Sequence, residues 1–325
     1  MAVALLGVVA LASGCGSGGS GSSGSSGGSG GADIAFLAGV VDHSYTPAQV
    51  KGLEAGGQGS VQTYNPEFNP TKQVEQCQDA IASQRYDAIV VTPVSNTSAI
   101  PCAKEAAAAS IPLVVDQTVI GPNLNEIQPQ VEGVTGSVIL VPKSFAEYSW
   151  ELIQEACGNT SPCQVVNELS FEGDPLFEEE LNYVKEQSEG TSIEVVATYE
   201  SQYEPSQTTS KLPDILLAHP DTSVVLCAND PTALAAAEVV KETGKQSQIK
   251  VIGTGGTATA KAAIESGKLF GTIATYPQTM SKIEGEIARK AADGEKTPPS
   301  TDGFTVGSVV GGVTKANVTQ FEPQW

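Results

Sequence analysis

Tyr86-Asp-Ala-Ile-Val-Val-Thr-Pro93 and Ile111-Pro-Leu-Val-Val-Asp116 are two short runs of apolar residues, most of them β-branched. Between them, residues 98–109 are rich in alanine, which favours a helix. Continuous apolar strands that alternate with helices are typical of a parallel sheet with helices on both faces. Residues 86–116 therefore predict a strand, a helix and a parallel strand, as in α/β folds.

The same alternation continues in both directions along the chain. Upstream, an apolar run at residues 33–40 predicts a strand, and Asn69-Pro70 opens a predicted helix over residues 70–83. Downstream, a Pro- and Asn-rich stretch precedes a second series of strands, predicted at residues 164–169, 193–198, 223–227, 250–253 and 269–275. The chain is thus predicted to form two doubly wound α/β lobes that bind ligands at the carboxyl ends of their strands.

Length and charge limit the class of protein. The chain has 325 residues, enough for two domains, and its 17 Lys and Arg against 37 Asp and Glu give a formal net charge of −20. This charge repels phosphate backbones and anionic headgroups, so we expect no nucleic-acid partner and no direct membrane binding by the lobes. The only arginines are Arg85 and Arg289, so few planar cations are available to an anion site.

The first 31 residues are predicted to lie outside the lobes. Residues 2–12 are an apolar run typical of a signal peptide, and they lead into Leu11-Ala-Ser-Gly-Cys15, which resembles the lipobox of bacterial lipoproteins. Residues 16–31 are all Gly or Ser, as in a flexible tether. We expect a signal peptide over residues 1–14 and a lipid on Cys15 that anchors the protein outside the bacterial cell membrane. The alternative is a secretion signal that is cleaved to release a free protein.

The other five cysteines fit an exported protein. Cys157 and Cys163 flank a turn-rich loop short enough for a disulfide. Cys77 and Cys102 lie in successive predicted helices that a βαβαβ unit would place side by side, so we expect a second disulfide there. Cys227 lies in an apolar strand and is expected to be a buried free thiol. None of them has metal-ligand spacing, and the chain has two histidines, so no metal site is expected.

Two motifs suggest other chemistry but lack essential partners. Gly253-Thr-Gly-Gly-Thr-Ala258 fits a dinucleotide fingerprint, yet Thr275 stands where an acidic residue would bind the ribose, so we expect no cofactor. Asp42, His43 and Glu54 could suggest a hydrolytic or metal site, but one histidine without a nucleophile is a weak signal. No residue is therefore assigned a catalytic role, and an enzyme is not expected.

A family resemblance rests on the order of several motifs. They are Asn69-Pro-Thr-Lys-Gln-Val-Glu-Gln76, the two runs in residues 86–116, Leu216-Leu-Ala-His-Pro-Asp221, Cys227-Ala-Asn-Asp230, Val251-Ile-Gly-Thr-Gly-Gly-Thr257 and Gly267-Lys-Leu-Phe-Gly-Thr-Ile-Ala-Thr-Tyr-Pro277. Over residues 32–318 the chain resembles the ribose-binding type of periplasmic binding proteins, which are the solute receptors of sugar ABC importers. The resemblance implies two lobes joined by a three-segment hinge, with the solute held between them.

The resemblance also implies boundaries and partners. Lobe 1 would comprise residues 32–130 and 276–302 and lobe 2 residues 131–275 and 303–325, with crossings near 117–132, 275–278 and 301–307. The expected protein is a monomer that serves an ABC permease and its ATPase. A receptor lipoprotein that feeds a signalling partner would have the same features. A sugar-responsive repressor shares the fold but would need a basic helix-turn-helix before the lobes.

Matching family positions one at a time gives a candidate site. Asp116 matches an acidic ligand residue, and Asn229 matches an amide ligand, with Asp230 and Pro231 expected as N-cap and N1 of the next helix. The expected ligand-binding residues are His43, Tyr45, Thr92, Asp116, Gln117, Phe171, Glu178, Tyr203, Asn229, Gly255 and Thr275.

Departures from the family indicate the kind of solute. Gln117 and Glu178 stand where the family has arginines, and Thr254 and Gly255 replace an aromatic residue and an aspartate. A site without these cations should reject phosphorylated or carboxylated solutes, because an anion loses its hydration there without a cationic partner. The sequence therefore favours a neutral solute that is polyhydroxylated or partly aromatic, such as a sugar, polyol or related compound, and it leaves a cationic solute as the alternative.

Overall fold

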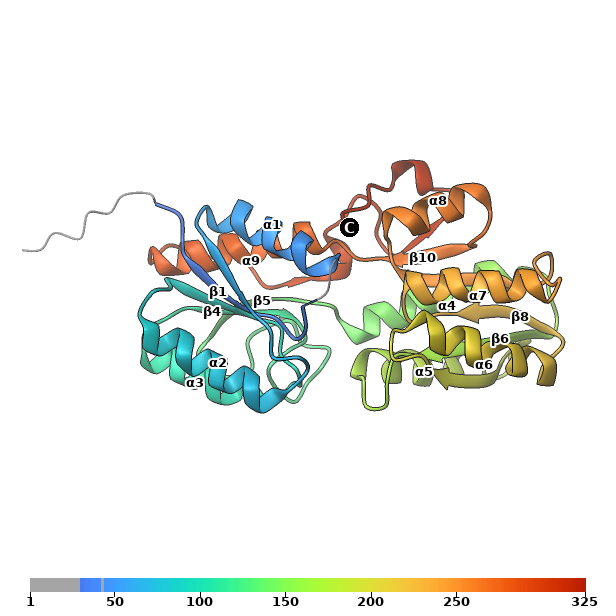
Figure 1. The fold of residues 1–325 in the computed structure, drawn as a ribbon, viewed down its shortest axis with the longest axis horizontal. Coiled ribbons are helices and arrows are strands. Elements are labelled where there is room, and N and C mark those ends of the chain that lie inside the picture. Colours follow the sequence, from blue (N-terminus) through green and yellow to red (C-terminus); the bar gives the residue numbers. More distant parts are fainter. Residues whose placement is uncertain (1–29, 42–43) are drawn as a thin grey trace, which may run out of the picture. The chain divides into compact units, whose positions relative to one another are not determined.

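The computed structural model describes residues 30–41 and 44–325. These residues form two six-stranded sheets (Figure 1). The first sheet contains β1 (Ile34–Leu37), β2 (Val61–Tyr64), β3 (Ala88–Val91), β4 (Leu113–Gln117), β5 (Val134–Ile139) and β11 (Thr301–Asp302). The second contains β6 (Cys163–Leu169), β7 (Ile193–Glu200), β8 (Thr222–Leu226), β9 (Lys250–Gly255), β10 (Gly271–Ala274) and β12 (Gly312–Thr314).

The two sheets repeat one topology. Their strand orders are β2-β1-β3-β4-β5-β11 and β7-β6-β8-β9-β10-β12. All neighbouring strands are parallel except β10 and β12, which are antiparallel. The central strands β1, β3 and β8 are fully buried, as expected for strands that helices cover on both sides. The prediction of two doubly wound parallel-sheet lobes is confirmed.

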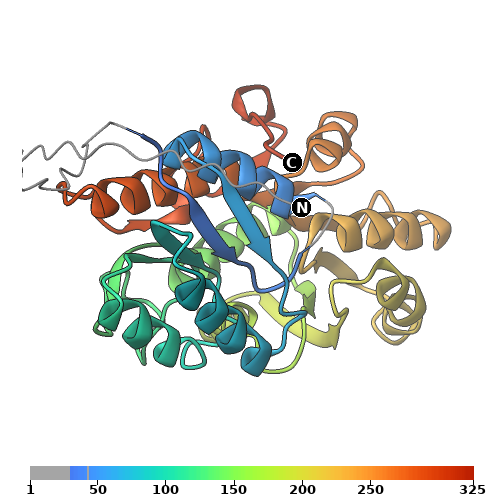
Figure 2. The same ribbon diagram turned by 60° about the vertical axis from the view of Figure 1, so that its left-hand side comes forward.

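Helices cover both faces of each sheet (Figures 1 and 2). They are α1 (Tyr45–Gly57), α2 (Pro70–Ser83), α3 (Ile100–Ala108), α4 (Pro142–Cys157), α5 (Pro175–Ser188), α6 (Pro205–Ala218), α7 (Asp230–Glu242), α8 (Ala258–Ser266) and α9 (Pro277–Ala292). On the first sheet, α1 and α9 pack together on one face and α2 and α3 on the other. On the second sheet, α4 packs with α5 and α6 packs with α7.

Helix α2 forms over the predicted residues because both of its ends carry local signals. The side chain of Asn69 accepts a hydrogen bond from the Lys72 amide (3.1 Å), and Pro70 occupies the first turn, where no backbone donor is needed. At the other end, Gln84 takes a left-handed conformation (φ 52°) and closes the helix. Cys77 and Ala80 face the core between these ends.

Helices α1 and α9 approach closely because glycine lies at their contact. A Cβ atom on Gly52 would lie 2.3 Å from the Gln278 carbonyl oxygen, and one on Gly56 would lie 2.0 Å from that of Lys282. From the other side, a Cβ on Gly285 would lie 2.6 Å from the Leu53 carbonyl oxygen. The chain between α1 and α9 spans most of the protein, so this contact closes the first lobe.

Three segments pass between the sheets, and the first differs from its expected place. Strand β5 pairs with β4 and β11 in the first sheet, so the chain crosses between Ile139 and the start of α4 rather than within residues 117–132. The expected boundary at residue 130 would have put β5 in the second lobe. The other two passages lie between β10 and α9 and between β11 and β12.

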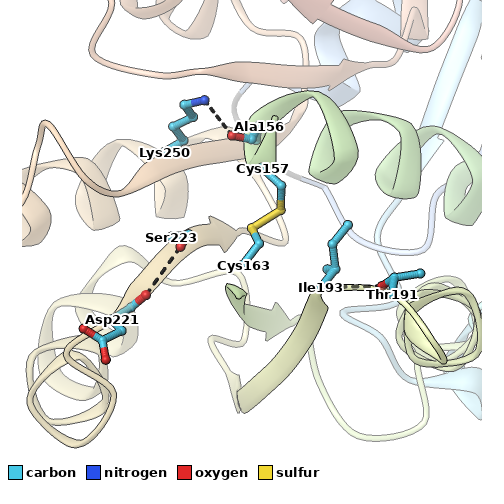
Figure 3. Close-up of a disulfide and its surroundings, with 8 residues drawn as sticks. All are labelled: Ala156, Cys157, Cys163, Thr191, Ile193, Asp221, Ser223 and Lys250. Carbon is cyan, nitrogen blue, oxygen red and sulfur yellow. Dashed lines mark hydrogen bonds between the residues drawn. A yellow bond between two sulfur atoms is a disulfide. The ribbon is translucent and has the colours of Figure 1, made fainter. Parts of the chain in front are cut away.

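Both predicted disulfides are present, Cys77–Cys102 and Cys157–Cys163, and Cys227 is a buried free thiol. The first joins α2 to α3 on one face of the first sheet. Figure 3 shows the second, which joins the end of α4 to the start of β6. Nearby, the Lys250 ammonium group donates to the Ala156 carbonyl oxygen in the last turn of α4 (2.5 Å).

Some predictions fall outside the part of the chain that the structure describes. These are the signal peptide, the lipid site at Cys15, the tether up to residue 29, and the candidate ligand residue His43. Within residues 30–41 and 44–325, no helix has the length and apolar character needed to cross a membrane.

Candidate functional site

The carboxyl ends of β3 and β4 bring three predicted residues together around one carboxylate. Asp116 at the end of β4 is only 1% exposed. Its Oδ2 accepts hydrogen bonds from Thr92 Oγ1 (2.5 Å), Gln117 Nε2 (3.0 Å) and Gln49 Nε2 on α1 (2.8 Å). A charged acceptor holds such donors more firmly than a neutral one. Asp116 therefore orients Thr92 and Gln117, whose side chains remain partly exposed.

Asp116 also lies beside a second carboxyl group, which the sequence analysis did not identify. Glu284 on α9 is fully buried and lies against Asp116. Burial, and then the charge of Asp116, raise the pKa of Glu284 well above its usual range. Burial also raises the pKa of Asp116, while hydrogen bonds from Glu284, Thr92, Gln117 and Gln49 oppose that rise. Of the two carboxyl groups, Glu284 is therefore the one whose neutral, protonated form burial and its neighbour favour more strongly.

In the second lobe, a carboxylate likewise accepts hydrogen bonds from side chains that follow β6 and β7. Asp174, the N-cap of α5, accepts from Ser170 Oγ (2.7 Å) and from the Tyr203 hydroxyl (3.0 Å). Tyr203 packs edge-on against Phe171, with ring centroids 6.1 Å apart. Burial, and then the charge of Asp174, raise the pKa of Tyr203 well above its usual range, so its hydroxyl stays a donor.

Asn229 is both a predicted ligand residue and the N-cap of α7. Its Oδ1 accepts from the Thr232 amide (2.8 Å), while its Nδ2 donates to the Tyr203 carbonyl oxygen (3.2 Å). The expected cap at Asp230 is therefore wrong, and the cap lies one residue earlier because Asn229 has the extended backbone (φ −150°, ψ 169°) that capping needs. The Asn229 side chain is thus hydrogen-bonded to Tyr203, another predicted site residue of the second lobe.

Asp230 has a different role, in holding the loop that follows β9. Its carboxylate is fully buried and accepts from the Thr257 amide (2.7 Å) and from Thr272 Oγ1 on β10 (2.6 Å). Burial raises its pKa to about 6, against the effect of these hydrogen bonds. The glycine-rich motif at residues 253–258 is thus fixed by an internal carboxylate.

Gly255 and Thr275 meet where β9 and β10 end. The Gly255 carbonyl oxygen accepts from the Thr275 amide (3.0 Å) and from Thr275 Oγ1 (2.9 Å). It also accepts from the indole Nε1 of Trp325 (3.1 Å), a residue that sequence reasoning did not single out. The two predicted residues therefore lie together, beside an aromatic ring.

Two aromatic contacts join the halves of the molecule. Tyr45, in the first turn of α1, meets Trp325 edge-on with ring centroids 4.9 Å apart. Phe68, in the loop before α2, meets Phe171 after β6 with ring centroids 6.3 Å apart. Phe68 is 53% exposed, and its φ of 58° marks a turn in the loop that carries it. The predicted residues Tyr45 and Phe171 each lie at one of these contacts.

The remaining predicted residue stands apart from these groups. Glu178 lies in the first turn of α5 with its side chain exposed, and its backbone amide donates to the Asp174 carbonyl oxygen. Its negative charge there favours the positive end of the helix dipole. A separate hollow of about 760 Å³ lies among α7, α8 and the starting ends of β9 and β10, and no predicted ligand residue lines it.

Two lobes of the same parallel topology, with polar and aromatic side chains at their strand ends, define a type I periplasmic binding protein. The chain belongs to the periplasmic binding protein domain family, whose model matches residues 34–296. The ribose import binding protein RbsB of Salmonella typhimurium is 32% identical over 102 residues, which are 31% of this chain and 34% of that protein. The match thus spans about a third of that curated relative.

Solved structures of solute-binding proteins share the whole fold. An ABC transporter periplasmic solute binding protein from Actinobacillus succinogenes with bound D-allose has a TM-score of 0.75 at 24% identity and covers 89% of this chain and 99% of its own. One from Bacillus halodurans with bound myo-inositol has a TM-score of 0.75 at 22% identity and covers 92% of this chain and 100% of its own. At these identities the likeness establishes the fold.

Proposed function

We propose that the protein binds a small neutral polyhydroxylated solute, a sugar or polyol, between the strand ends of its two lobes and presents it to an ABC importer. The observation that carries this proposal is the convergence of predicted residues from both lobes on shared contacts. Tyr45 of the first lobe meets Trp325 beside Gly255, and Phe171 of the second meets Phe68. A solute between these contacts would touch both lobes and favour their closed arrangement.

Charge supports a neutral solute. Among the described residues, the acids Asp116, Asp174 and Asp230 accept hydrogen bonds from neutral donors, and no lysine or arginine forms a salt bridge with them. The two arginines are engaged elsewhere. Arg85 lies over the Tyr86 ring, 5.6 Å from its centroid, and Arg289 pairs with Asp293 at 3.5 Å. A phosphorylated solute would lose its hydration here without a cationic partner.

Within the proposed site, Asp116 and Asn229 remain the expected solute contacts, one from each lobe. Both already hold protein donors or acceptors, so a solute hydroxyl would replace a partner such as Thr92 on Asp116. Hydrogen bonds to a carboxylate are stronger than those to an amide, so the loss of Asp116 should weaken binding more than the loss of Asn229. The other predicted contacts are His43, Tyr45, Thr92, Gln117, Phe171, Glu178, Tyr203, Gly255 and Thr275.

A thermal-shift and calorimetry panel tests this function. The purified protein would be titrated with D-ribose, D-allose, D-fucose, myo-inositol and glycerol, and with ribose 5-phosphate as the matched anionic control. A solute at 100 times its dissociation constant should stabilise the protein by about 2.7 kcal/mol. Ribose 5-phosphate should not bind. The proposal is contradicted if no neutral solute binds, or if the phosphorylated sugar binds as tightly as ribose.

The importer role and the location outside the membrane belong to the same proposal. Relatives named as import binding proteins, such as RbsB, support an importer subunit over a signalling receptor and over an enzyme. Cys15 would carry the lipid anchor, so Cys15→Ser should move the protein from the membrane fraction to the soluble fraction. Retention of the variant in the membrane fraction would rule out anchoring through Cys15. Stimulation of the ATPase of a reconstituted permease by the solute-loaded protein tests the partner.

A further inference from the structure

Trp325 contacts one predicted site residue from each lobe, Tyr45 and Gly255. Its indole Nε1 donates to the Gly255 carbonyl oxygen (3.1 Å), and its ring stands edge-on to Tyr45 with an angle of 88° between the planes. Its backbone carbonyl oxygen accepts from the Ala258 amide at the start of α8 (2.9 Å). The residue is therefore held at both its backbone and its side chain. The residue as a whole remains partly exposed.

The loop after β9 is shaped to receive this ring. Gly255 has a φ of 132°, and a Cβ atom there would lie 2.7 Å from Cζ2 of Trp325. The next residue repeats the pattern, because a Cβ on Gly256 would lie 2.8 Å from Cζ of Phe321. Two successive glycines thus leave room for two aromatic rings of the C-terminal segment. Phe321 is fully buried and belongs to the core of the second lobe, whereas Trp325 is partly exposed.

We propose that Trp325, together with Tyr45, forms an aromatic wall of the solute site and selects solutes that have a ring with an apolar face. This inference rests on the proposed function and names its solute class. The C–H face of a pyranose or cyclitol is apolar, so contact with a rigid indole removes apolar surface from water on both sides. An acyclic polyol such as glycerol has no such face. Trp325 therefore acts on ring selectivity, while the polar residues of the site act on hydroxyl recognition.

Fluorescence tests the contact directly, because the chain has two tryptophans. Trp150 lies on α4 and is 8% exposed in the core of the second lobe. In a Trp150→Phe background, Trp325 is the sole tryptophan. D-allose or myo-inositol should then shift its emission and reduce its quenching by acrylamide. An unchanged spectrum at saturating solute overturns the inference.

Calorimetry with three variants distinguishes a contribution of the aromatic ring to solute affinity from a contribution of apolar bulk alone. Trp325→Ala and Trp325→Leu should each raise the dissociation constant for D-allose and myo-inositol by about tenfold, whereas Trp325→Phe should change it by less than about threefold. Leucine is apolar and bulky but has no aromatic face, so weaker solute binding by Trp325→Leu would show that the aromatic ring itself contributes to affinity. Glycerol should bind the three variants and the parent alike. Thermal unfolding of each unliganded variant verifies that it is folded.

The outcomes separate this inference from the proposed function. If the parent binds ring solutes and Trp325→Ala and Trp325→Leu bind them equally well, the aromatic wall is wrong while the function stands. If glycerol loses as much affinity as the ring solutes, ring selectivity is wrong. If no solute of the panel binds the parent protein, both the proposed function and the inferred aromatic wall are contradicted.

Discussion

Glu284 on α9 and Asp116 at the end of β4 place their carboxyl groups against each other inside the first lobe, and burial together with the charge of Asp116 raises the pKa of Glu284 well above its usual range. Glu284 follows the second passage between the sheets, so its contact with Asp116 joins the returning chain to the strand end that carries the predicted site. In its neutral form, Glu284 adds no second buried charge next to Asp116, and a second buried charge would be unfavourable. The carboxylate that remains orients Thr92, Gln117 and Gln49.

This pair predicts opposite results for two isosteric amide variants. Glu284→Gln keeps a donor toward Asp116, so we expect the free energy of unfolding to change by less than about 1 kcal/mol. Asp116→Asn removes the charged acceptor of several buried donors and should lower the free energy of unfolding by about 1 to 3 kcal/mol. Urea denaturation at pH 7 measures both. Equal destabilisation by the two variants would show that Glu284 is not the protonated partner.

Glu180 on α5 should make stability fall as pH rises. It is 1% exposed, and burial raises its pKa to about 8, against hydrogen bonds from Ser149 and Asn167. The unfolded chain releases this proton near the ordinary glutamate pKa of 4.5, while the folded protein keeps it to about pH 8. Between these values the folded state binds more protons, so the free energy of unfolding decreases with rising pH.

Denaturation at several pH values between 5 and 8 checks this direction. The matched control is Glu180→Gln, which is neutral at every pH and should show a flatter dependence. Asp230 and Glu284 also have raised pKa values, so some slope should remain in the control. A wild-type slope equal to that of Glu180→Gln would contradict the assignment to Glu180.

The contact between α1 and α9 should not tolerate a methyl group. Gly56→Ala would normally favour a helix, but its Cβ would lie 2.0 Å from the Lys282 carbonyl oxygen, so the helices must move apart. We expect the variant to lose about 1 to 3 kcal/mol of stability. Ala55→Leu, on the exposed side of the same helix, is the control and should change stability little. A neutral Gly56→Ala would show that the helices separate at no cost.

The two disulfides should differ in their contribution to stability. Cys77–Cys102 closes a sequence separation of 25 residues and Cys157–Cys163 one of 6. In the chain-entropy model, removing the first should cost about 3.5 kcal/mol and removing the second about 2 kcal/mol. Double Cys→Ser variants of each pair, compared by denaturant unfolding, measure the difference. A larger loss from the shorter loop would reverse the predicted order.

Local sequence signals account well for the frame of the fold. The apolar runs at β1, β3 and β4 have continuous burial, which a covered parallel sheet requires. The cap at Asn69 and Pro70 set the start of α2. The same signals missed β2 (Val-Gln-Thr-Tyr), which is an edge strand with partly exposed residues. They also missed β5 (Val-Thr-Gly-Ser-Val-Ile), whose polar residues break the apolar run.

By itself, the sequence determined the α/β alternation, the Cys157–Cys163 pair and the shortage of arginine, because each depends on composition or on residues close along the chain. Only the tertiary structure placed β5 in the first sheet, Glu284 against Asp116, and Trp325 beside Gly255 and Tyr45. These contacts join segments that are far apart along the chain, and no periodicity encodes which of them meet. Close packing and the need to pair buried polar groups decide them once the lobes have formed.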